Sequence, residues 1–221
     1  MCVTALLSVL LQHRPEEARV FIADFTTADS EWAEHAEEIE RSFPGEIKVV
    51  GRQREVSSML ATIAQEMRTR GEDSSAKKTI YLVLQGMHRI KVLREDEEDE
   101  EGKNAVELLG VILRDGPEVG IHVIAWADTW ANATRGLGRK RFGEFGLRVG
   151  ATMNSEESMN FLDSAAASRL SKPHRAILFD EERPGQLVTF RPYAMASLAR
   201  LKEIGNQLRT RITIDSQAPA P

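Results

Sequence analysis

The chain has 221 residues, a net charge of −5 and a single cysteine, Cys2. Its length fits one domain with appendages, and its apolar content of 42% is sufficient for a buried core. Without a basic excess, it does not resemble a nucleic-acid-binding module that acts alone, so any DNA contact would be local or shared among subunits.

The single cysteine excludes an internal disulfide and fits a reducing cytoplasm. The scattered histidines predict no metal site, and no apolar run approaches the roughly 20 residues that cross a membrane.

The amino-terminal part of the sequence predicts a buried helix followed by alternating strands and helices. Cys2–His13 is apolar on nearly every side, which is typical of a buried helix. It has no capping sequence and almost no chain before it, so we expect upstream sequence to be missing, with a natural start as the alternative. The next expected elements are a strand at Ala18–Phe25, a helix around Trp32–Arg41, a strand at Ile47–Val50 and an amphipathic helix at Glu55–Arg70.

The alternation continues in the carboxy-terminal part. Glu95–Glu101 is uniformly acidic and predicts a solvated loop, because like charges repel one another. Glycines break the polar segment after Trp126. Strands are expected at Thr79–Leu84, Ile121–Trp126 and Leu147–Val149, with Ala176–Phe179 pairing with Leu187–Phe190, and helices at Asn104–Leu113, Ser155–Leu170 and Met195–Arg211.

This order of elements predicts an α/β fold with a mostly parallel sheet and helices on both of its faces. Ligands of such sheets bind at the carboxyl ends of the strands. The loops after Phe25, Leu84 and Trp126 are therefore the first places to look for a functional site.

Several segments, taken in chain order, resemble one known family. The most specific is Leu108–Thr129, a helix containing Arg114 that leads into GIHVIAWADT. The resemblance is to the FtsK/SpoIIIE motor ATPases, which are RecA-like hexameric DNA translocases, and it covers about residues 1–192. The other segments that carry it are Asp24–Phe25 with Val49–Val50, Glu66–Arg70 (EMRTR), Phe145–Val149, Ser155–Asp163 and Ala176–Phe179.

The resemblance implies a RecA-like P-loop NTPase core over residues 1–192, followed by a helix over 193–211 and a disordered tail over 212–221. It implies ATP and Mg²⁺ as cofactors of the intact parent domain, double-stranded DNA as a partner, and a ring of identical subunits or contacts with neighbouring ATPase domains. The expected location is cytoplasmic, and membrane anchoring of the parent protein is left open.

Two departures from the family concern nucleotide chemistry. A Walker A loop wraps backbone N–H groups around phosphates, and the family places it before a helix that matches Val3–Gln12. Only Met1 and Cys2 precede that helix here, so either the sequence is incomplete at its amino terminus or nucleotide binds in another way. At the Walker B position, Gln85 and Gly86 replace an aspartate that holds Mg²⁺ and a glutamate that activates water. Neither side chain can act as a base, so we expect weak or absent hydrolysis.

Other residues at predicted strand ends have two readings each. Asp128 and Thr129 match the family's sensor position, or they simply turn the chain out of the sheet. Arg148 matches an arginine finger for a neighbouring subunit's nucleotide, or it forms a structural ion pair. Asp24 faces the cleft or caps the next segment. His88 and Arg89 have a surface role at a helix start, or they face the same cleft as the altered Walker B strand. The remaining assignments are a hydrogen-bonded core role for His122 and packing for Trp126 and Trp130.

The densest basic cluster follows the last predicted parallel strand. It consists of Arg135, Arg139, Lys140 and Arg141, with Gly136 and Gly138 beside it. Glycines indicate a mobile loop, and mobile basic loops can hold DNA phosphates in the pore of a ring. An ordinary charged surface is the alternative.

The function most consistent with the sequence is part of an FtsK/SpoIIIE-like ATP-dependent DNA translocase that does not hydrolyse ATP as an isolated chain. The alternative is a non-catalytic RecA-like module that binds partners, like the later ATPase domains of type VII secretion motors. A third reading is a fragment of a reading frame with no independent function. The sequence does not decide whether the chain is an enzyme.

Overall fold

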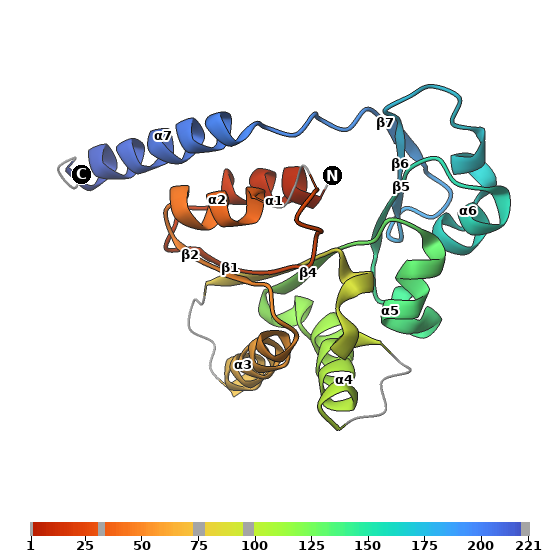
Figure 1. Ribbon diagram of the computed structural model, residues 1–221, viewed down its shortest axis with the longest axis horizontal. Coiled ribbons are helices and arrows are strands. Elements are labelled where there is room, and N and C mark those ends of the chain that lie inside the picture. Colours follow the sequence, from red (N-terminus) through yellow and green to blue (C-terminus); the bar gives the residue numbers. More distant parts are fainter. Residues whose placement is uncertain (1, 31–33, 73–77, 95–99, 218–221) are drawn as a thin grey trace.

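The computed structural model describes residues 2–30, 34–72, 78–94 and 100–217 (Figure 1). Most of the acidic run at 95–101 lies outside these residues, and its last two residues begin a helix. Residues 218–221 of the predicted tail also lie outside them. None of the described helices combines the length and the apolar character needed to cross a membrane.

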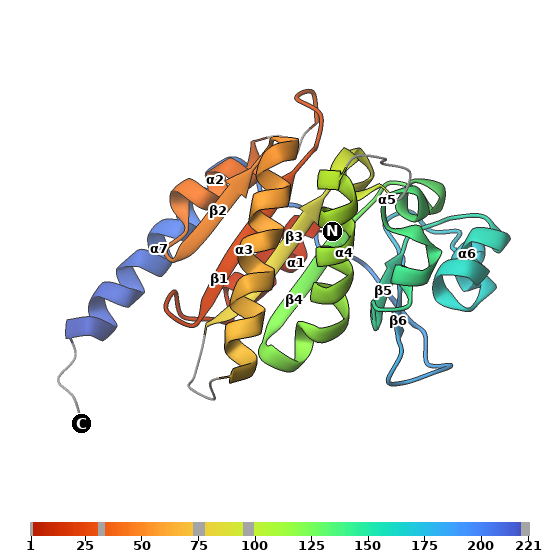
Figure 2. The same ribbon diagram turned by 90° about the horizontal axis from the view of Figure 1, so that it is seen from below.

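The centre of the molecule is a four-stranded, fully parallel sheet in the order β2-β1-β3-β4. Its strands are β1 (Ala18–Asp24), β2 (Glu46–Val50), β3 (Thr79–Gln85) and β4 (Ile121–Trp126), so the prediction of a parallel α/β sheet is confirmed. The sheet lies between helices on both faces, as Figures 1 and 2 show.

The two edges of this sheet differ in chemistry. β2 carries the charged residues Glu46 and Lys48, whereas β4 (IHVIAW) carries no charged residue. Only Ile121 of β4 is fully buried, and the other five residues are half-buried. β4 thus has the composition of an interior parallel strand, although in the described structure it pairs only with β3.

One face of the sheet is covered by α3 (Gln53–Glu72) and α4 (Glu100–Asp115). Apolar side chains recur every three or four residues along α3, so one stripe of it faces the sheet. Val56, Leu60 and Ile63 of this stripe are completely buried. Together with residues of α4 and the inward face of β3, they form the largest hydrophobic cluster of the described chain.

The opposite face is covered by α1 (Cys2–Leu10) and α2 (His35–Ser42). The prediction that the first helix is buried on nearly every side is wrong. Leu6 and Leu7 are buried against the sheet, but Ser8 is exposed and Leu11, just after the helix, is 53% exposed. The reason is that α1 packs on β3 and β4 from one side only.

Beyond β4 the chain forms a smaller unit. It contains α5 (Trp130–Phe142), β5 (Leu147–Gly150), α6 (Ser155–Leu162), β6 (Ala176–Asp180) and β7 (Val188–Phe190), with the strands in an antiparallel sheet of order β5-β6-β7. The predicted pairing of the last two strands is confirmed. The predicted helix Ser155–Leu170 is shorter, because Asp163 adopts a left-handed conformation (φ 52°) that ends it. Short 3₁₀ turns complete the chain at Met87–Arg89 (η1), Lys91–Leu93 (η2), Pro117–Val119 (η3) and Ala165–Arg169 (η4).

The last helix, α7 (Leu198–Gln217), returns across the molecule and packs on α2 (Figure 1). It continues past residue 211 into the segment predicted as disordered, because neither glycine nor proline interrupts the chain until Pro219. Leu201 is completely buried, and the Arg209 guanidinium donates to the carbonyl oxygen of Arg41 at the end of α2 (2.7 Å). The helix is therefore part of the hydrophobic core on this face.

The crossing of α7 over α2 requires a residue without a side chain. A Cβ atom on Gly205 would collide with the backbone carbonyl of Ser42. We expect Gly205→Leu to force the two helices apart and to lower the free energy of unfolding by about 2 kcal/mol, which chemical denaturation measures. The neighbouring Asn206 is exposed, so Asn206→Leu serves as the control and should leave stability within about 0.5 kcal/mol. Equal stability of the two variants would contradict the close crossing.

Candidate functional site

Three side chains from adjacent strands form a row at the carboxyl edge of the main sheet. Asp24 of β1 is paired in register with Gln85 of β3, and Gln85 is paired with Trp126 of β4. Alternation along each strand places all three on the face covered by α1 and α2. Leu6 of α1 lines a small void of about 10 Å³ together with Asp24 and Gln85. The predicted loops thus do meet at one edge of the sheet.

Asp24 both faces this edge and caps the following segment. Its Oδ1 accepts hydrogen bonds from the backbone N–H of Thr26 (2.9 Å) and from the Thr26 hydroxyl (2.8 Å). This local turn ends β1 and directs the chain away from the sheet. The two readings of Asp24 from the sequence are therefore compatible.

Gln85 is a buried, neutral side chain at the end of β3. Only 5% of the residue is exposed, and its Oε1 atom has no hydrogen-bond partner among the described atoms. A buried amide oxygen without a partner is energetically costly, and such positions often accept a hydrogen bond from a bound group. The amide carries no charge, so it cannot replace a carboxylate as a base.

Gly86, directly after Gln85, has a backbone conformation that favours glycine. Its φ of 69° and ψ of 40° are left-handed, and a Cβ atom there would lie 3.1 Å from the carbonyl oxygen of Phe25. The same turn is tied to β1, because the Phe25 N–H donates to the Gln85 carbonyl (3.0 Å). A residue with a side chain at position 86 would therefore be strained.

His88 follows this turn and faces Asp128 beyond β4. The His88 Nε2 and Asp128 Oδ2 atoms are 3.7 Å apart, and the His88 ring lies edge-on to Trp126 (6.2 Å between centroids). Burial lowers the pKa of His88, and the opposing charge of Asp128 only partly offsets this effect. The surface role predicted for His88 is wrong, because the residue is 9% exposed, whereas the neighbouring Arg89 is exposed.

Asp128 and Thr129 together start α5. The Thr129 hydroxyl accepts a hydrogen bond from the Asn132 N–H (3.2 Å), and the Asn132 amide donates to Asp128 Oδ1 (2.8 Å). Burial raises the pKa of Asp128, but this hydrogen bond and the charge of His88 outweigh burial, so the pKa lies below its usual value. Asp128 thus turns the chain out of the sheet and also faces the site, and its sensor role stays a prediction.

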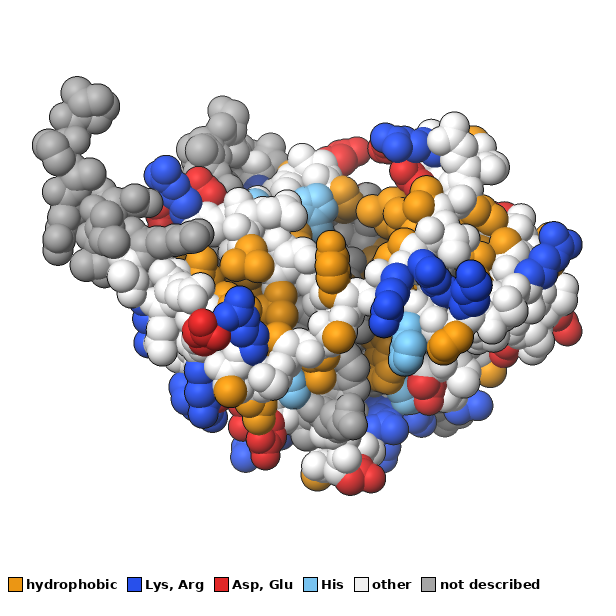
Figure 3. Space-filling model, turned by 90° about the horizontal axis from the view of Figure 1, so that it is seen from above, with side chains coloured by type: hydrophobic (Ala, Val, Ile, Leu, Met, Phe, Trp, Pro, Cys, Tyr) orange, Lys and Arg blue, Asp and Glu red, His pale blue; other side chains and the backbone are white. Residues whose placement is uncertain are grey.

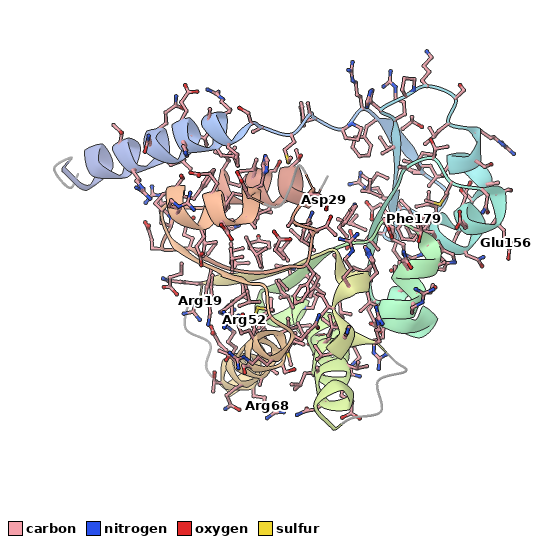
Figure 4. The ribbon with its side chains drawn as sticks, viewed as in Figure 1. Arg19, Asp29, Arg52, Arg68, Glu156 and Phe179 are labelled. Carbon is pink, nitrogen blue, oxygen red and sulfur yellow. The ribbon has the colours of Figure 1, made fainter. Side chains whose placement is uncertain are left out.

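Arg148 lies apart from this edge, within the smaller antiparallel sheet. Its guanidinium donates to the carbonyl oxygens of Phe145 (3.0 Å) and Phe161 (3.3 Å) and stacks over the ring of Phe179 (4.8 Å to the centroid). Asp163 completes these contacts at 3.8 Å. The geometry matches the structural reading of Arg148, and its role as an arginine finger stays a prediction. Figure 4 labels Phe179 on β6.

The basic cluster lies on a helix and not in a loop, which corrects the prediction. α5 is interrupted within the cluster at Gly138, whose backbone is not helical (φ 69°, ψ 150°), so the cluster spans a kink between two helical segments. The Arg135 side chain is exposed, whereas the Arg141 guanidinium lies beside Gly110 of α4. The side chains of Arg139 and Lys140 lie outside the described part of the structure.

The two tryptophans pack as expected, whereas His122 is half-buried and not a residue of the core. Trp130 lies against Phe142 and Phe161, with centroids 5.0 and 5.6 Å apart, which joins α5 to α6. His122 stacks on Tyr81 (5.6 Å), and the Tyr81 hydroxyl lies 2.9 Å from His13 Nε2. The pKa of His122 is lowered mainly by burial and further by the nearby charge of His13.

The residues present at the carboxyl edge do not fit a Mg²⁺–ATP site. Mg²⁺ is bound by one or two carboxylates together with phosphate oxygens. Here β3 ends in an amide and a glycine, and one oxygen of Asp24 is already occupied by Thr26. Within the described residues, no cluster of three or more histidine, cysteine, aspartate or glutamate side chains is placed to hold a metal ion.

No protein-family model matches the sequence, and no curated protein matches it significantly. The fold, by contrast, is similar to solved structures. The pCW3 conjugation coupling protein TcpA, in a monomer form with ATPγS, matches with a TM-score of 0.71 at 14% identity, over 95% of this chain and 61% of that chain. The cytoplasmic domain of the Thermomonospora curvata type VII secretion ATPase EccC matches with a TM-score of 0.61 at 18% identity, over 92% of this chain and 25% of that one.

A third structure, EccC ATPases 2 and 3 with a signal sequence peptide, also gives a TM-score of 0.61 at 18% identity, over 94% of this chain and 39% of that one. The chain therefore has the fold of RecA-like P-loop ATPase domains, which confirms the predicted fold class. It spans about three fifths or less of the length of these proteins.

The left-handed turn at Gly86 gives a direct test of this site. Gly86→Ala should lower the free energy of unfolding by about 1–2 kcal/mol, because a Cβ atom is strained in this conformation and close to Phe25. Urea denaturation measures the change, and Gly146→Ala, where the added Cβ atom would meet only a side-chain carboxylate at 3.7 Å, is the control. If Gly86→Ala were as stable as the control, the turn would not be constrained.

Proposed function

We propose that this chain is a motor-domain unit of an FtsK/SpoIIIE-like, ATP-dependent DNA translocase and that it does not itself hydrolyse ATP. The observation that carries the proposal is the end of β3, where a RecA-like strand leads into Gln85 and a left-handed Gly86. The fold supports the motor class, and these two residues support the absence of hydrolysis. The proposed location is the cytoplasm.

Nucleotide binding would need groups beyond those at the carboxyl edge. TcpA was solved with ATPγS, which supports nucleotide binding as a property of similar domains. The 221 residues contain no glycine-rich loop that ends in lysine followed by serine or threonine, so a phosphate loop would be supplied from elsewhere, for example by a neighbouring domain in a ring. ATP and Mg²⁺ are accordingly proposed as cofactors of such an assembly and not of this chain alone.

The proposed DNA contact lies on α5. Arg135 is exposed on this helix, and Arg139 and Lys140 follow it in sequence. The net charge of the chain is negative, so a local cluster repeated around a ring would have to supply the attraction for double-stranded DNA.

Hydrolysis is the first test. The unchanged chain should release no phosphate from ATP above the blank, with or without DNA, and Gln85→Asp should not restore turnover, because Gly86 still provides no base. Phosphate release measured over time decides this. Sustained ATP turnover by the unchanged chain would overturn the proposal if Asp128→Ala abolished it. The loss in this variant would show that hydrolysis occurs at this site and does not come from a contaminating enzyme.

DNA binding is the second test. Replacing Arg135, Arg139 and Lys140 by alanine should weaken binding of a short blunt-ended duplex about tenfold and should reduce the slope of log affinity against log salt by up to about 3. Fluorescence anisotropy at several salt concentrations measures both quantities.

The control removes the same charge from a different helix. Arg52, Arg54 and Arg68 are exposed on and beside α3, as Figure 4 shows for Arg52 and Arg68. Their triple alanine variant should bind DNA like the unchanged chain. Equal losses in the two triple variants would mean that only net charge matters and that α5 is not the contact.

A second candidate function is a non-catalytic module that binds a protein partner. It is favoured by the face of the small sheet opposite α6, where Val149, Leu178 and Val188 are paired in one row across the strands. Val149 is 37% and Val188 53% exposed, and Figure 3 shows hydrophobic side chains on this part of the surface. One similar structure, EccC ATPases 2 and 3, is described in complex with a signal sequence peptide. A chain that binds no duplex in the anisotropy experiment would favour this function.

A further inference from the structure

A continuous series of polar contacts joins the exposed side of α5 to the turn after β3. Arg135 Nη1 donates to Asn132 Oδ1 (3.1 Å), and Asn132 Nδ2 donates to Asp128 Oδ1 (2.8 Å). The other carboxylate oxygen of Asp128 faces His88 Nε2 at 3.7 Å. The four side chains therefore connect two of the regions described above, the proposed DNA contact and the end of the Walker B strand.

The two ends of this series lie in opposite environments. Arg135 is exposed to solvent, whereas the His88 side chain is 8% exposed and its Nδ1 atom has no hydrogen-bond partner among the described atoms. The backbone carbonyl of His88 accepts a hydrogen bond from Arg94 (3.3 Å), and the residue lies two positions after Gly86. A change in the charge of His88 would thus act on the constrained turn at the site.

Four charged groups surround the His88 ring. Asp128 favours its protonated form, and Arg89, Arg94 and Arg135 disfavour it, in addition to burial. Arg135 is the only one of the three arginines that belongs to the proposed DNA contact. Neutralising Arg135 with a bound phosphate would remove one of the influences that lower the pKa of His88.

We propose that Asn132 and Asp128 are positioning residues that transmit the binding of a DNA phosphate at Arg135 to His88 and the turn after β3. The inference rests on the proposed DNA contact of α5 and adds its regulatory consequence. A phosphate that binds Arg135 competes with Asn132 Oδ1 for the guanidinium. The Asn132 side chain can then move, which changes its hydrogen bond to Asp128. The distance between Asp128 and His88 then changes, and with it the protonation of His88.

The test follows the titration of His88 by NMR, using the full chain and a short blunt-ended DNA duplex. The His88 ring resonance is assigned by its loss in His88→Gln. In the unchanged chain, the duplex should move the midpoint of this titration upward. In Asn132→Ala, which keeps the helix and the Arg135 charge, the duplex should bind but raise the midpoint less, because only the direct effect of the Arg135 charge remains.

Arg68→Ala on α3 is the matched control, because it removes one exposed arginine that is not among the charges acting on His88. It should leave both the midpoint and its response to DNA unchanged. Thermal unfolding of all variants establishes that they are folded. An equal response to DNA in Asn132→Ala would show that the effect passes through space and would overturn the proposal, as would DNA binding without any response of His88.

A DNA-free comparison separates this proposal from the proposed function. Arg135→Ala removes the cation directly and should raise the His88 midpoint, and the same substitution in the Asn132→Ala background should raise it less. If the duplex fails to bind, the DNA contact of α5 is wrong, and this comparison still decides whether the series of contacts transmits charge. Equal midpoint changes in both backgrounds would refute the transmission.

Discussion

The left-handed backbone of Gly86 is the constraint around which the carboxyl edge of the sheet is arranged. Because Gly86 lies against the Phe25 carbonyl and Gln85 is hydrogen-bonded to the Phe25 N–H, the ends of β1 and β3 hold each other in place. The turn also starts the 3₁₀ segment that carries His88 towards Asp128. A glutamate, or any other residue with a side chain, would therefore be strained at position 86 in this backbone.

The parallel sheet could be predicted from the sequence, because its strands are short apolar runs and its helices have a clear apolar stripe. α3 and β3 show this best, since their apolar positions match the side chains that are buried. Gln85 and Gly86 could also be identified from their position after a buried strand. The conformation of Gly86 could not, because glycine is compatible with most backbone geometries and the contact with Phe25 is formed between strands that are distant in sequence.

The predictions that were wrong also failed because contacts between residues distant in sequence decide the structure. His88 was assigned to the surface as a residue at a helix start, yet Trp126 of β4 and Asp128 just beyond this strand lie against it. The spacing of Asp128 and Asn132, four residues apart at the start of a helix, was the available signal for the contact series. The basic cluster was assigned to a loop because of its glycines, but packing of Trp130 and Phe142 on α6 holds α5 as a helix. α7 was treated as an appendage, whereas its burial depends on a close approach at Gly205 that no local pattern reveals.

The composition of β4 has a practical consequence for work with the isolated chain. Soluble proteins commonly protect an open sheet edge with charged side chains, as β2 does with Glu46 and Lys48. β4 offers an uncharged, half-buried edge instead, and such edges recruit further strands from other molecules. Self-association of the concentrated protein would then begin at β4. A lysine introduced into this strand would reduce it more directly than a change of buffer.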